Sequence, residues 1–125
     1  MVMFNTEENG LRTVIKDYQE SALKYLWRLE EGVGGSSREV WVNVNVDLMG
    51  KKTISRASII NFLNYEVDEG ILTFNEITGK GGHRRIYKAK YDETGTKAYL
   101  AKRIIAKMLE TWPQETRDAI ASLTG

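Results

Sequence analysis

The sequence predicts an α+β fold, mostly α, in which three helices precede a β-hairpin and a helical C-terminal segment follows it. Apolar residues recur at intervals of three and four in several separate stretches, which indicates amphipathic helices. Two β-rich runs joined by a glycine-rich segment indicate the hairpin. With 125 residues, 42% of them hydrophobic and 28% charged, the chain is long enough for one domain with a hydrophobic core.

The first helix is predicted over Val14–Leu29. Its apolar side chains lie at helical spacing, with charged residues mostly between them: Ile15, Tyr18, Ala22, Leu26 and Leu29. The glycine-rich run Gly32–Gly35 ends this helix. Ser36, followed three residues later by Glu39, has the spacing of a capping box and predicts the start of a second helix.

The stretch Val40–Val46 is compatible with two kinds of secondary structure, a strand and a helix. It alternates apolar and polar residues and is rich in β-branched side chains, which favours a strand. A helix would instead gather Trp41, Val44 and Leu48 on one side and end near Gly50. We favour the helix, because a capping pattern precedes it and because of the elements that follow, and the strand stays an open alternative.

A third helix is predicted from a cap at Thr53 or Ser55 to Val67, ending before Gly70. One face is apolar and suits a core, whereas the opposite face is small and polar. That outer face suits the DNA major groove, since asparagine pairs with adenine, arginine with guanine or phosphate, and a methyl group with thymine. An ordinary surface helix would look similar. The candidate base-contacting residues are Arg56, Ala57, Ser58, Ile60, Asn61 and Asn64.

The hairpin is predicted with strands at 71–77 and 86–91 and a long, basic turn at 78–85. Its glycines would let the loop approach a nucleic-acid backbone closely. Lys80, Arg84 and Arg85 are the candidate phosphate or minor-groove contacts, and Lys51 and Lys52 are weaker phosphate candidates. A nucleotide-phosphate loop is excluded, because the full G-x-x-x-x-G-K-[ST] pattern and a following helix are missing.

Charge is unevenly distributed along the chain, although the net charge is only +1. Between Met1 and Ser36 there are four basic and six acidic residues, whereas between Ile77 and Leu109 there are nine basic and two acidic ones. A charge run can be a merely solvated face. Its coincidence with the hairpin favours a polyanionic partner.

Several classes of function are excluded or disfavoured. The chain has no cysteine and a single histidine, His83, so disulfides, thiolate nucleophiles and cysteine- or histidine-built metal sites are ruled out. No serine lies in a nucleophile-elbow pattern, and Asp92 and Glu93 suit a helix N-terminus. We expect a protein that is not an enzyme and uses no metal or cofactor. Without a signal peptide or a run of roughly 18 apolar residues, a cytoplasmic location is expected.

The C-terminal segment carries an apolar stripe on a long helix, Thr96–Trp112. The stripe consists of Leu100, Ile104, Met108 and Trp112, broadened by Tyr99, Ile105 and Leu109. Pro113 begins a short final helix, whose expected buried side is Ala119, Ile120 and Leu123. The segment either folds back on its own domain or pairs with a second copy. We favour a homodimer, because the stripe is too apolar to leave in water. A dimer would also set the third helices of two copies about one turn of DNA apart.

This order of elements resembles winged helix-turn-helix transcriptional regulators, most closely the penicillinase repressor family of the BlaI/MecI type. The matching runs are Ser21–Trp27, Ser55–Leu63 continuing through Val67–Leu72, and Arg85–Ala89, within a similarity over about residues 12 to 112. MarR-like and PadR-like regulators share the order. The resemblance implies a dimeric DNA-binding repressor, with the helix at about 55–67 in the major groove and the wing at 78–86 on the backbone or minor groove. The cysteine-rich tail of related copper repressors is absent, which excludes metal sensing by thiolates.

We therefore expect a winged-helix DNA-binding domain at residues 1–92 and a helical dimerisation segment at 93–125. The expected function is sequence-specific binding of a near-palindromic operator in double-stranded DNA, with repression of transcription. The alternative is a winged-helix interaction module that binds protein or RNA without operator specificity.

Overall fold

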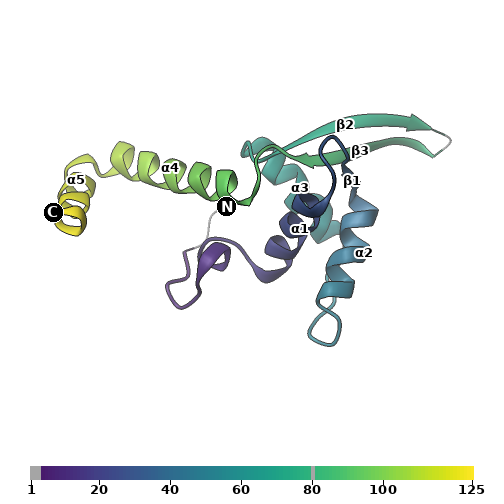
Figure 1. The fold of residues 1–125 in the computed structure, drawn as a ribbon, viewed down its shortest axis with the longest axis horizontal. Helices are drawn as coiled ribbons and strands as arrows, with labels where there is room; N and C mark the ends of the chain where they lie inside the picture. The colour runs from purple at the N-terminus through teal and green to yellow at the C-terminus, as the bar shows by residue number, and fades with distance from the viewer. Residues whose placement is uncertain (1–3, 80) are drawn as a thin grey trace. The chain divides into compact units, whose positions relative to one another are not determined.

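A computed structural model describes residues 4–79 and 81–125 (Figure 1). The chain divides into two compact units, one ending at Glu93 and the other spanning Thr94–Gly125. In chain order the elements are η1 (Gly10–Thr13, a 3₁₀ turn), α1 (Asp17–Arg28), β1 (Gly35–Ser36), α2 (Ser37–Asp47), α3 (Arg56–Asp68), β2 (Leu72–Gly79), β3 (Gly82–Ala89), α4 (Glu93–Thr111) and α5 (Pro113–Thr124).

The core of the first unit lies between α1, α2 and α3 and is closed on one side by the sheet (Figure 1). Each helix contributes apolar residues at three- or four-residue spacing, as an amphipathic helix does when it buries one face. The buried set is Ala22, Leu23 and Leu26 from α1, Val40 and Val44 from α2, Ile59, Phe62 and Leu63 from α3, and Ile71, Leu72 and Tyr87 from the hairpin region. Burial of a side chain of this size stabilises the fold by about 1.5–3 kcal/mol.

The first helix begins later than the apolar periodicity predicts, at Asp17 and not at Val14. Residues 10–13 form the separate turn η1, after which Lys16 is extended at the N-cap position. The backbone N–H of Lys16 donates to Gln19 Oε1 at 2.9 Å, so the first turn of α1 is closed by a side chain of that helix.

The ambiguous stretch Val40–Val46 is helical, because α2 covers all of it. The capping box is present as predicted: Ser36 Oγ accepts from the Glu39 N–H at 3.2 Å, and Glu39 Oε1 accepts from the Ser36 N–H at 3.0 Å. Val40 and Val44 lie one turn apart and are buried, whereas the intervening Val42 is 42% exposed. The cap and the buried face thus outweigh the strand-like alternation.

A short strand that the sequence did not predict, β1, completes the sheet. Strand β1 pairs antiparallel with β3, with Gly35 opposite Tyr87 and Ser36 opposite Ile86, and the strand order is β1-β3-β2. Gly34 has a steric reason to be glycine, since an added Cβ would lie 2.5 Å from Ile86 Cγ2 and 2.6 Å from the Tyr87 carbonyl oxygen. The glycine-rich run therefore lets the chain pass directly against β3.

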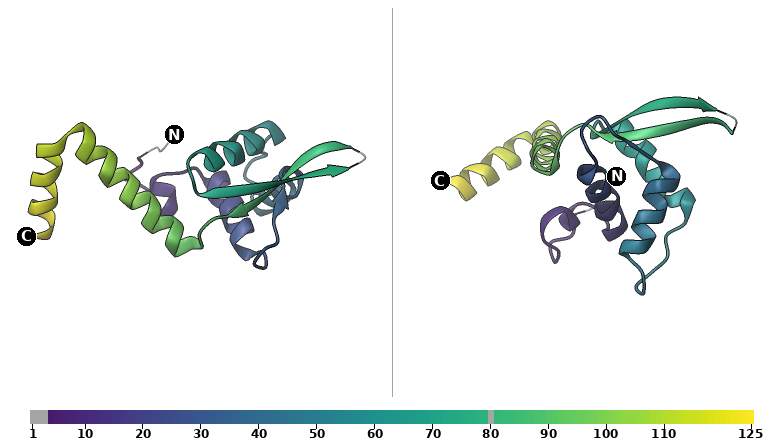
Figure 2. Two further views of the ribbon diagram at one scale, coloured as in Figure 1. Left: turned by 90° about the horizontal axis from the view of Figure 1, so that it is seen from above. Right: turned by 45° about the vertical axis from the view of Figure 1, so that its right-hand side comes forward.

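The strands of the hairpin extend further toward its tip than predicted. Strands β2 and β3 stay paired to the end, with Ile77 opposite Arg84 and Gly79 opposite Gly82. The predicted turn at 78–85 is therefore wrong, because backbone pairing continues through it and places Arg84 and Arg85 in a strand. Lys80 lies outside the described residues. Figure 2 shows the paired strands projecting beyond the three helices of this unit.

In the second unit, α5 leaves the end of α4 at a wide angle (Figure 2). Pro113 occupies the first turn of α5, as predicted, and Thr116 Oγ1 donates to the Met108 carbonyl oxygen at 3.0 Å. The predicted burial of Ala119, Ile120 and Leu123 is wrong for the single chain, where all three are exposed. The turn at Trp112 directs α5 away from α4, so these side chains have no apolar surface of α4 to pack against.

The observed fold class is the predicted one: a mostly helical α+β fold with a three-stranded antiparallel sheet, arranged as a winged helix with C-terminal helices. Within residues 4–79 and 81–125, no helix has the length and apolar character needed to span a bilayer.

Candidate nucleic-acid interface

Helix α3 presents a small, polar outer face. Ser55 caps the helix, its Oγ accepting from the Ser58 N–H at 3.1 Å, and this bond orients the first turn. Arg56, Ala57 and Asn61 are exposed. Ser58 is half-buried, with its hydroxyl 2.9 Å from Ser55 Oγ, and Ile60 is half-buried. The helix therefore offers a guanidinium, a methyl group and a carboxamide on one accessible side.

A hollow beside this face is lined jointly by α1 and α3. Its lining residues are Tyr18 and Gln19 from α1 and Ser58, Asn61, Phe62 and Tyr65 from α3. The Tyr18 ring meets Phe62 edge-on at 6.3 Å between centroids, which holds the two helices together at this point. Tyr18 and Gln19 were not among the predicted contacts. Helical periodicity places them on α1, but only the packing of α1 on α3 brings them beside Asn61.

The connection between α2 and α3 is anchored by side chains of α2. Trp41 Nε1 and Asn45 Nδ2 donate to the Ile54 carbonyl oxygen at 2.9 and 3.1 Å, and Asn45 Oδ1 accepts from the Ile54 N–H at 2.8 Å. Both backbone groups of Ile54 are thereby satisfied away from regular structure. These three bonds fix the point from which α3 starts.

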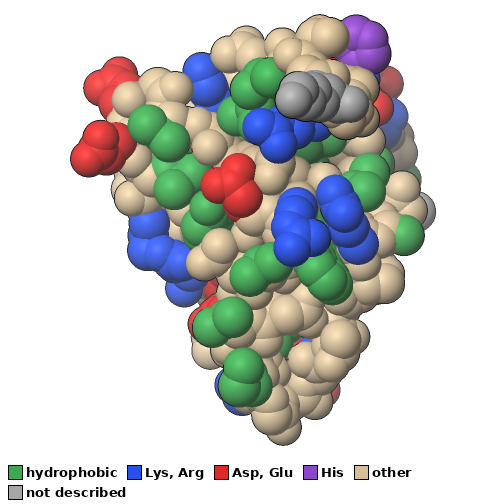
Figure 3. Space-filling view, turned by 90° about the vertical axis from the view of Figure 1, so that its right-hand side faces the viewer, with side chains coloured by type: hydrophobic (Ala, Val, Ile, Leu, Met, Phe, Trp, Pro, Cys, Tyr) green, Lys and Arg blue, Asp and Glu red, His purple; other side chains and the backbone are tan. Residues whose placement is uncertain are grey.

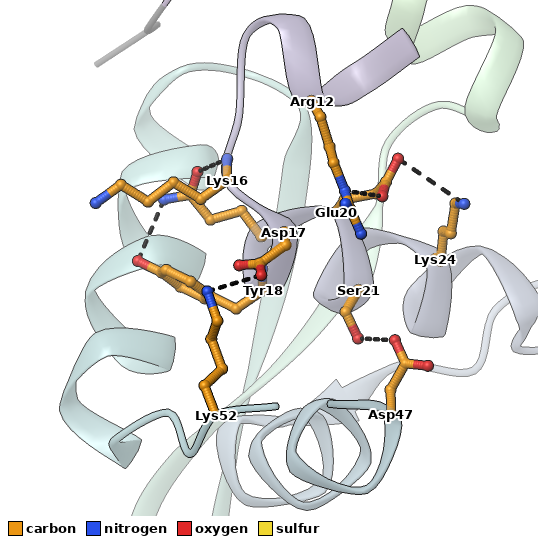
Figure 4. Close-up of polar contacts among 10 residues, drawn as sticks. Arg12, Lys16, Asp17, Tyr18, Glu20, Ser21, Lys24, Asp47 and Lys52 are labelled. Atoms are coloured by element: carbon orange, nitrogen blue, oxygen red, sulfur yellow. Dashed lines mark hydrogen bonds and ion pairs between the residues drawn. The ribbon is translucent and has the colours of Figure 1, made fainter. Parts of the chain in front are cut away.

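The two lysines of this connection have different surroundings. Lys51 and Lys52 are both exposed, but Lys52 Nζ lies 2.8 Å from Asp17 Oδ2 at the start of α1 (Figure 4). The hydrogen bond from Lys52 lowers the pKa of Asp17. Nearby, Ser21 Oγ donates to Asp47 Oδ2 at 2.7 Å and ties α1 to α2. The charge of Lys52 is thus partly compensated within the molecule.

The two wing arginines lie on opposite faces of β3, since side chains alternate along a strand. Arg84 is exposed and lies opposite Ile77. Arg85 is half-buried, and its guanidinium carbon lies 4.0 Å from the centroid of the Phe74 ring. A guanidinium over an aromatic face at this distance gains a cation–π attraction.

A helix–wing cluster, formed by Asn64, Phe74, Arg85 and Tyr87, joins α3 to the hairpin. Asn64 Oδ1 accepts from Arg85 Nη1 at 3.0 Å and from the hydroxyl of Tyr87. Tyr87 is only 3% exposed, and its burial raises the pKa of the phenol. Asn64 is half-buried and is not on the freely accessible face where the helical wheel put it.

The structure thus separates the predicted contact residues into groups. Figure 3 shows Lys and Arg side chains spread over the face toward which the wing projects, with hydrophobic side chains and some Asp and Glu side chains among them. Arg56, Ala57 and Asn61 are accessible on α3, Arg84 on the wing and Lys51 before α3, while Lys52, Asn64 and Arg85 have partners within the protein.

Among the described residues, no group of three or more His, Asp or Glu side chains is placed to hold a metal ion. The pairing of the one histidine is local: His83 Nδ1 lies 3.3 Å from Thr78 Oγ1 on the opposite strand.

Comparison with known proteins bears on the fold. No protein-family model matches the chain, and no curated protein matches it. A solved structure that it resembles is described as the Aeropyrum pernix ORC1 protein in complex with DNA, with a TM-score of 0.56 at 16% sequence identity. The match covers 76% of this chain and 26% of that chain. At this identity the likeness concerns the winged-helix fold, and the resemblance to the penicillinase repressors stays a prediction.

Proposed function

We propose that this protein binds double-stranded DNA sequence-specifically and regulates transcription as a homodimeric repressor. The observation that carries the proposal is the accessible polar face of α3, which stands beside a projecting, cationic hairpin. In this proposal α3 enters the major groove, while the hairpin contacts the sugar-phosphate backbone or the adjacent minor groove.

The outer face of α3 suits base recognition. Asn61 is exposed and can offer its amide donor and acceptor to an adenine, and Arg56 can reach a guanine or a phosphate. Ala57 is small enough to let the helix approach the bases and offers a methyl group to a thymine. Ser58 and Ile60 lie at the margins of this face and contribute secondary contacts.

The cationic groups around α3 suit phosphate contacts. Arg84 is exposed on the outer face of the wing, and Lys51 is exposed in the connection that leads into α3. Such contacts supply affinity and orientation but little sequence information. A solved structure of similar fold is described as being in complex with DNA, which supports the class of partner.

Dimerisation is proposed through the second unit. Ile105 and Met108 lie along one side of α4, and Trp112 follows directly after its last residue; these three side chains are 46%, 37% and 54% exposed, and Leu123 of α5 is 86% exposed. Large apolar side chains gathered at this density mark an association surface. A second copy would cover them and would present two α3 helices to a near-palindromic operator.

The decisive experiment is selection from a pool of random duplexes with the purified protein at physiological salt. We expect enrichment of one near-palindromic sequence, and we expect Arg56→Ala and Asn61→Ala each to weaken binding to it by about 1–3 kcal/mol. Retention of no duplex even at low salt would overturn the proposal. A parallel RNA pool that enriches in its place would support the interaction-module alternative.

A further inference from the structure

We propose that Asn64 and Arg85 are positioning residues that lock the wing against α3, and that they are not contacts to bases and phosphate as the sequence predicts. The inference rests on the proposed DNA-binding function and concerns how its two contacting surfaces are kept in register. Its basis is the helix–wing cluster of Asn64, Phe74, Arg85 and Tyr87.

The side-chain oxygen of Asn64 already accepts two hydrogen bonds from the wing. A carboxamide oxygen has two lone pairs, and Asn64 Oδ1 already accepts from Arg85 Nη1 and from the Tyr87 hydroxyl. Bidentate recognition of adenine needs both that oxygen as an acceptor and the amide nitrogen as a donor. Asn64 can therefore read a base in this way only if its bonds to the wing are broken.

The guanidinium of Arg85 is held by both an aromatic ring and a hydrogen bond. Its guanidinium stacks on Phe74 at 4.0 Å while donating to Asn64 at 3.0 Å, and the side chain is half-buried. A planar guanidinium held by a ring and by a hydrogen bond has little freedom to turn toward a phosphate. Arg84, the next residue, is exposed on the opposite face of the strand and has none of these constraints.

The shape of the hairpin makes such a lock useful. The wing projects beyond the helices, and the two residues of β1 pair with Ile86 and Tyr87 of β3. The bond from Arg85 to Asn64 fastens the strand to α3 just beyond that pairing. A wing that is held in place before binding loses less conformational freedom when the protein binds DNA. Correct placement of α3 then favours correct placement of the wing, and the reverse also holds.

Three variants separate positioning from base contact. Asn64→Ala removes the acceptor, and Tyr87→Phe removes one donor while keeping the buried ring. Asn64→Asp keeps an oxygen acceptor for both partners but lacks the amide donor that adenine recognition requires. The probes are the duplex enriched by the wild-type protein from a random pool and a scrambled duplex of equal composition. The measured quantity is the ratio of the affinity for the enriched duplex to that for the scrambled duplex. The charge added by Asn64→Asp affects binding to both duplexes, so its general effect cancels in this ratio.

We expect Asn64→Ala and Tyr87→Phe to lower this ratio by about tenfold, the scale of one buried hydrogen bond, and Asn64→Asp to keep it within about threefold. Arg84→Ala is the matched control and should weaken binding to both duplexes equally. The opposite result would be that Asn64→Asp lowers the ratio of the two affinities as much as Asn64→Ala does, while Tyr87→Phe leaves that ratio unchanged. In that case Asn64 contacts a base and the inference is overturned.

A measurement without DNA keeps the inference separate from the proposed function. Amide hydrogen exchange across residues 84–88 should be faster in Asn64→Ala and Tyr87→Phe than in the wild type, and close to wild type in Asn64→Asp. Equal exchange in all four proteins would overturn the lock. If the pool enriches no duplex but exchange follows the expected pattern, DNA recognition fails and the lock stands.

Discussion

The winged-helix unit and the C-terminal unit expose their apolar side chains to very different degrees. In the first, Ile59 and Leu63 are fully buried, and the accessible side of the same helix carries Arg56 and Asn61. In the second, Trp112 and Leu123 remain 54% and 86% exposed. The first unit completes its own core and exposes polar and cationic side chains. The second leaves large apolar side chains exposed to water, which is the basis of the proposed dimer.

The largest expected effect tests whether a buried side chain of the first unit contributes more to stability than an exposed one of the second unit. Leu63→Ala should lower the free energy of unfolding by about 3 kcal/mol, because it opens a cavity in the core. Leu123→Ala removes the same atoms from an exposed site and should change the stability of the monomer by less than about 0.5 kcal/mol. Urea denaturation followed by circular dichroism measures both. Equal losses would contradict the contrast between the two units.

The next effect tests the exposed surface of the second unit. Trp112→Asp should weaken self-association by about a hundredfold, because a charge would replace a large apolar side chain on the proposed association surface. Lys107→Asp is the control, since Lys107 lies on the other side of α4 by helical geometry. Sedimentation equilibrium at micromolar concentrations measures both variants. A monomeric wild-type protein under these conditions would refute the proposed dimer.

A smaller effect concerns the cationic surface of the first unit. Arg84→Ala should weaken binding to all duplexes by a similar factor and reduce the slope of log K against log salt by about one unit, the release of roughly one counterion. Fluorescence anisotropy titrations over a series of salt concentrations provide the slope. The variant could instead lose its preference for one duplex over another while the slope of log K against log salt stays unchanged. That result would show that Arg84 contacts a base.

The smallest effect concerns the ion pair between Asp17 and Lys52. Since Lys52 lowers the pKa of Asp17 below its ordinary value of 3.8, the pair stabilises the fold above that value, and this stability is lost as the pH falls through the lowered pKa. Asp17→Asn should therefore reduce stability at neutral pH by at most about 1 kcal/mol. The difference from wild type should vanish in acid below the lowered pKa. A difference that persists there would indicate a role for Asp17 other than charge.

Local patterns in the sequence predicted most of the first unit. The capping box at Ser36 and Glu39, the cap at Ser55 and the stop before Gly70 are each contained within a few residues, and the structure confirms them. The apolar face of α3 was likewise predicted, since helical periodicity depends only on spacing. Chain-local chemistry was thus sufficient to order the elements and to assign the fold class.

The errors have a different origin. The turn at 78–85 was misplaced because glycine and charged residues suggest a loop, while cross-strand pairing decides where a strand ends. Strand β1 was missed because Gly35 and Ser36 have little strand propensity of their own and become a strand only by pairing with β3. The outward side of Asn64 was misjudged because a helical wheel does not include the wing that packs against it.

By itself, the sequence determined the order of the helices and the hairpin, the N-terminal caps of α2 and α3, the basic character of the hairpin and the apolar stripe of the C-terminal helix. All of these depend on residues a few positions apart, whose interactions are set by backbone geometry. Only the tertiary structure decided that β1 joins the sheet, that Asp17 compensates Lys52, and that Asn64 holds Arg85 and Tyr87. Those contacts join residues far apart in the chain, and their formation depends on how complete elements pack.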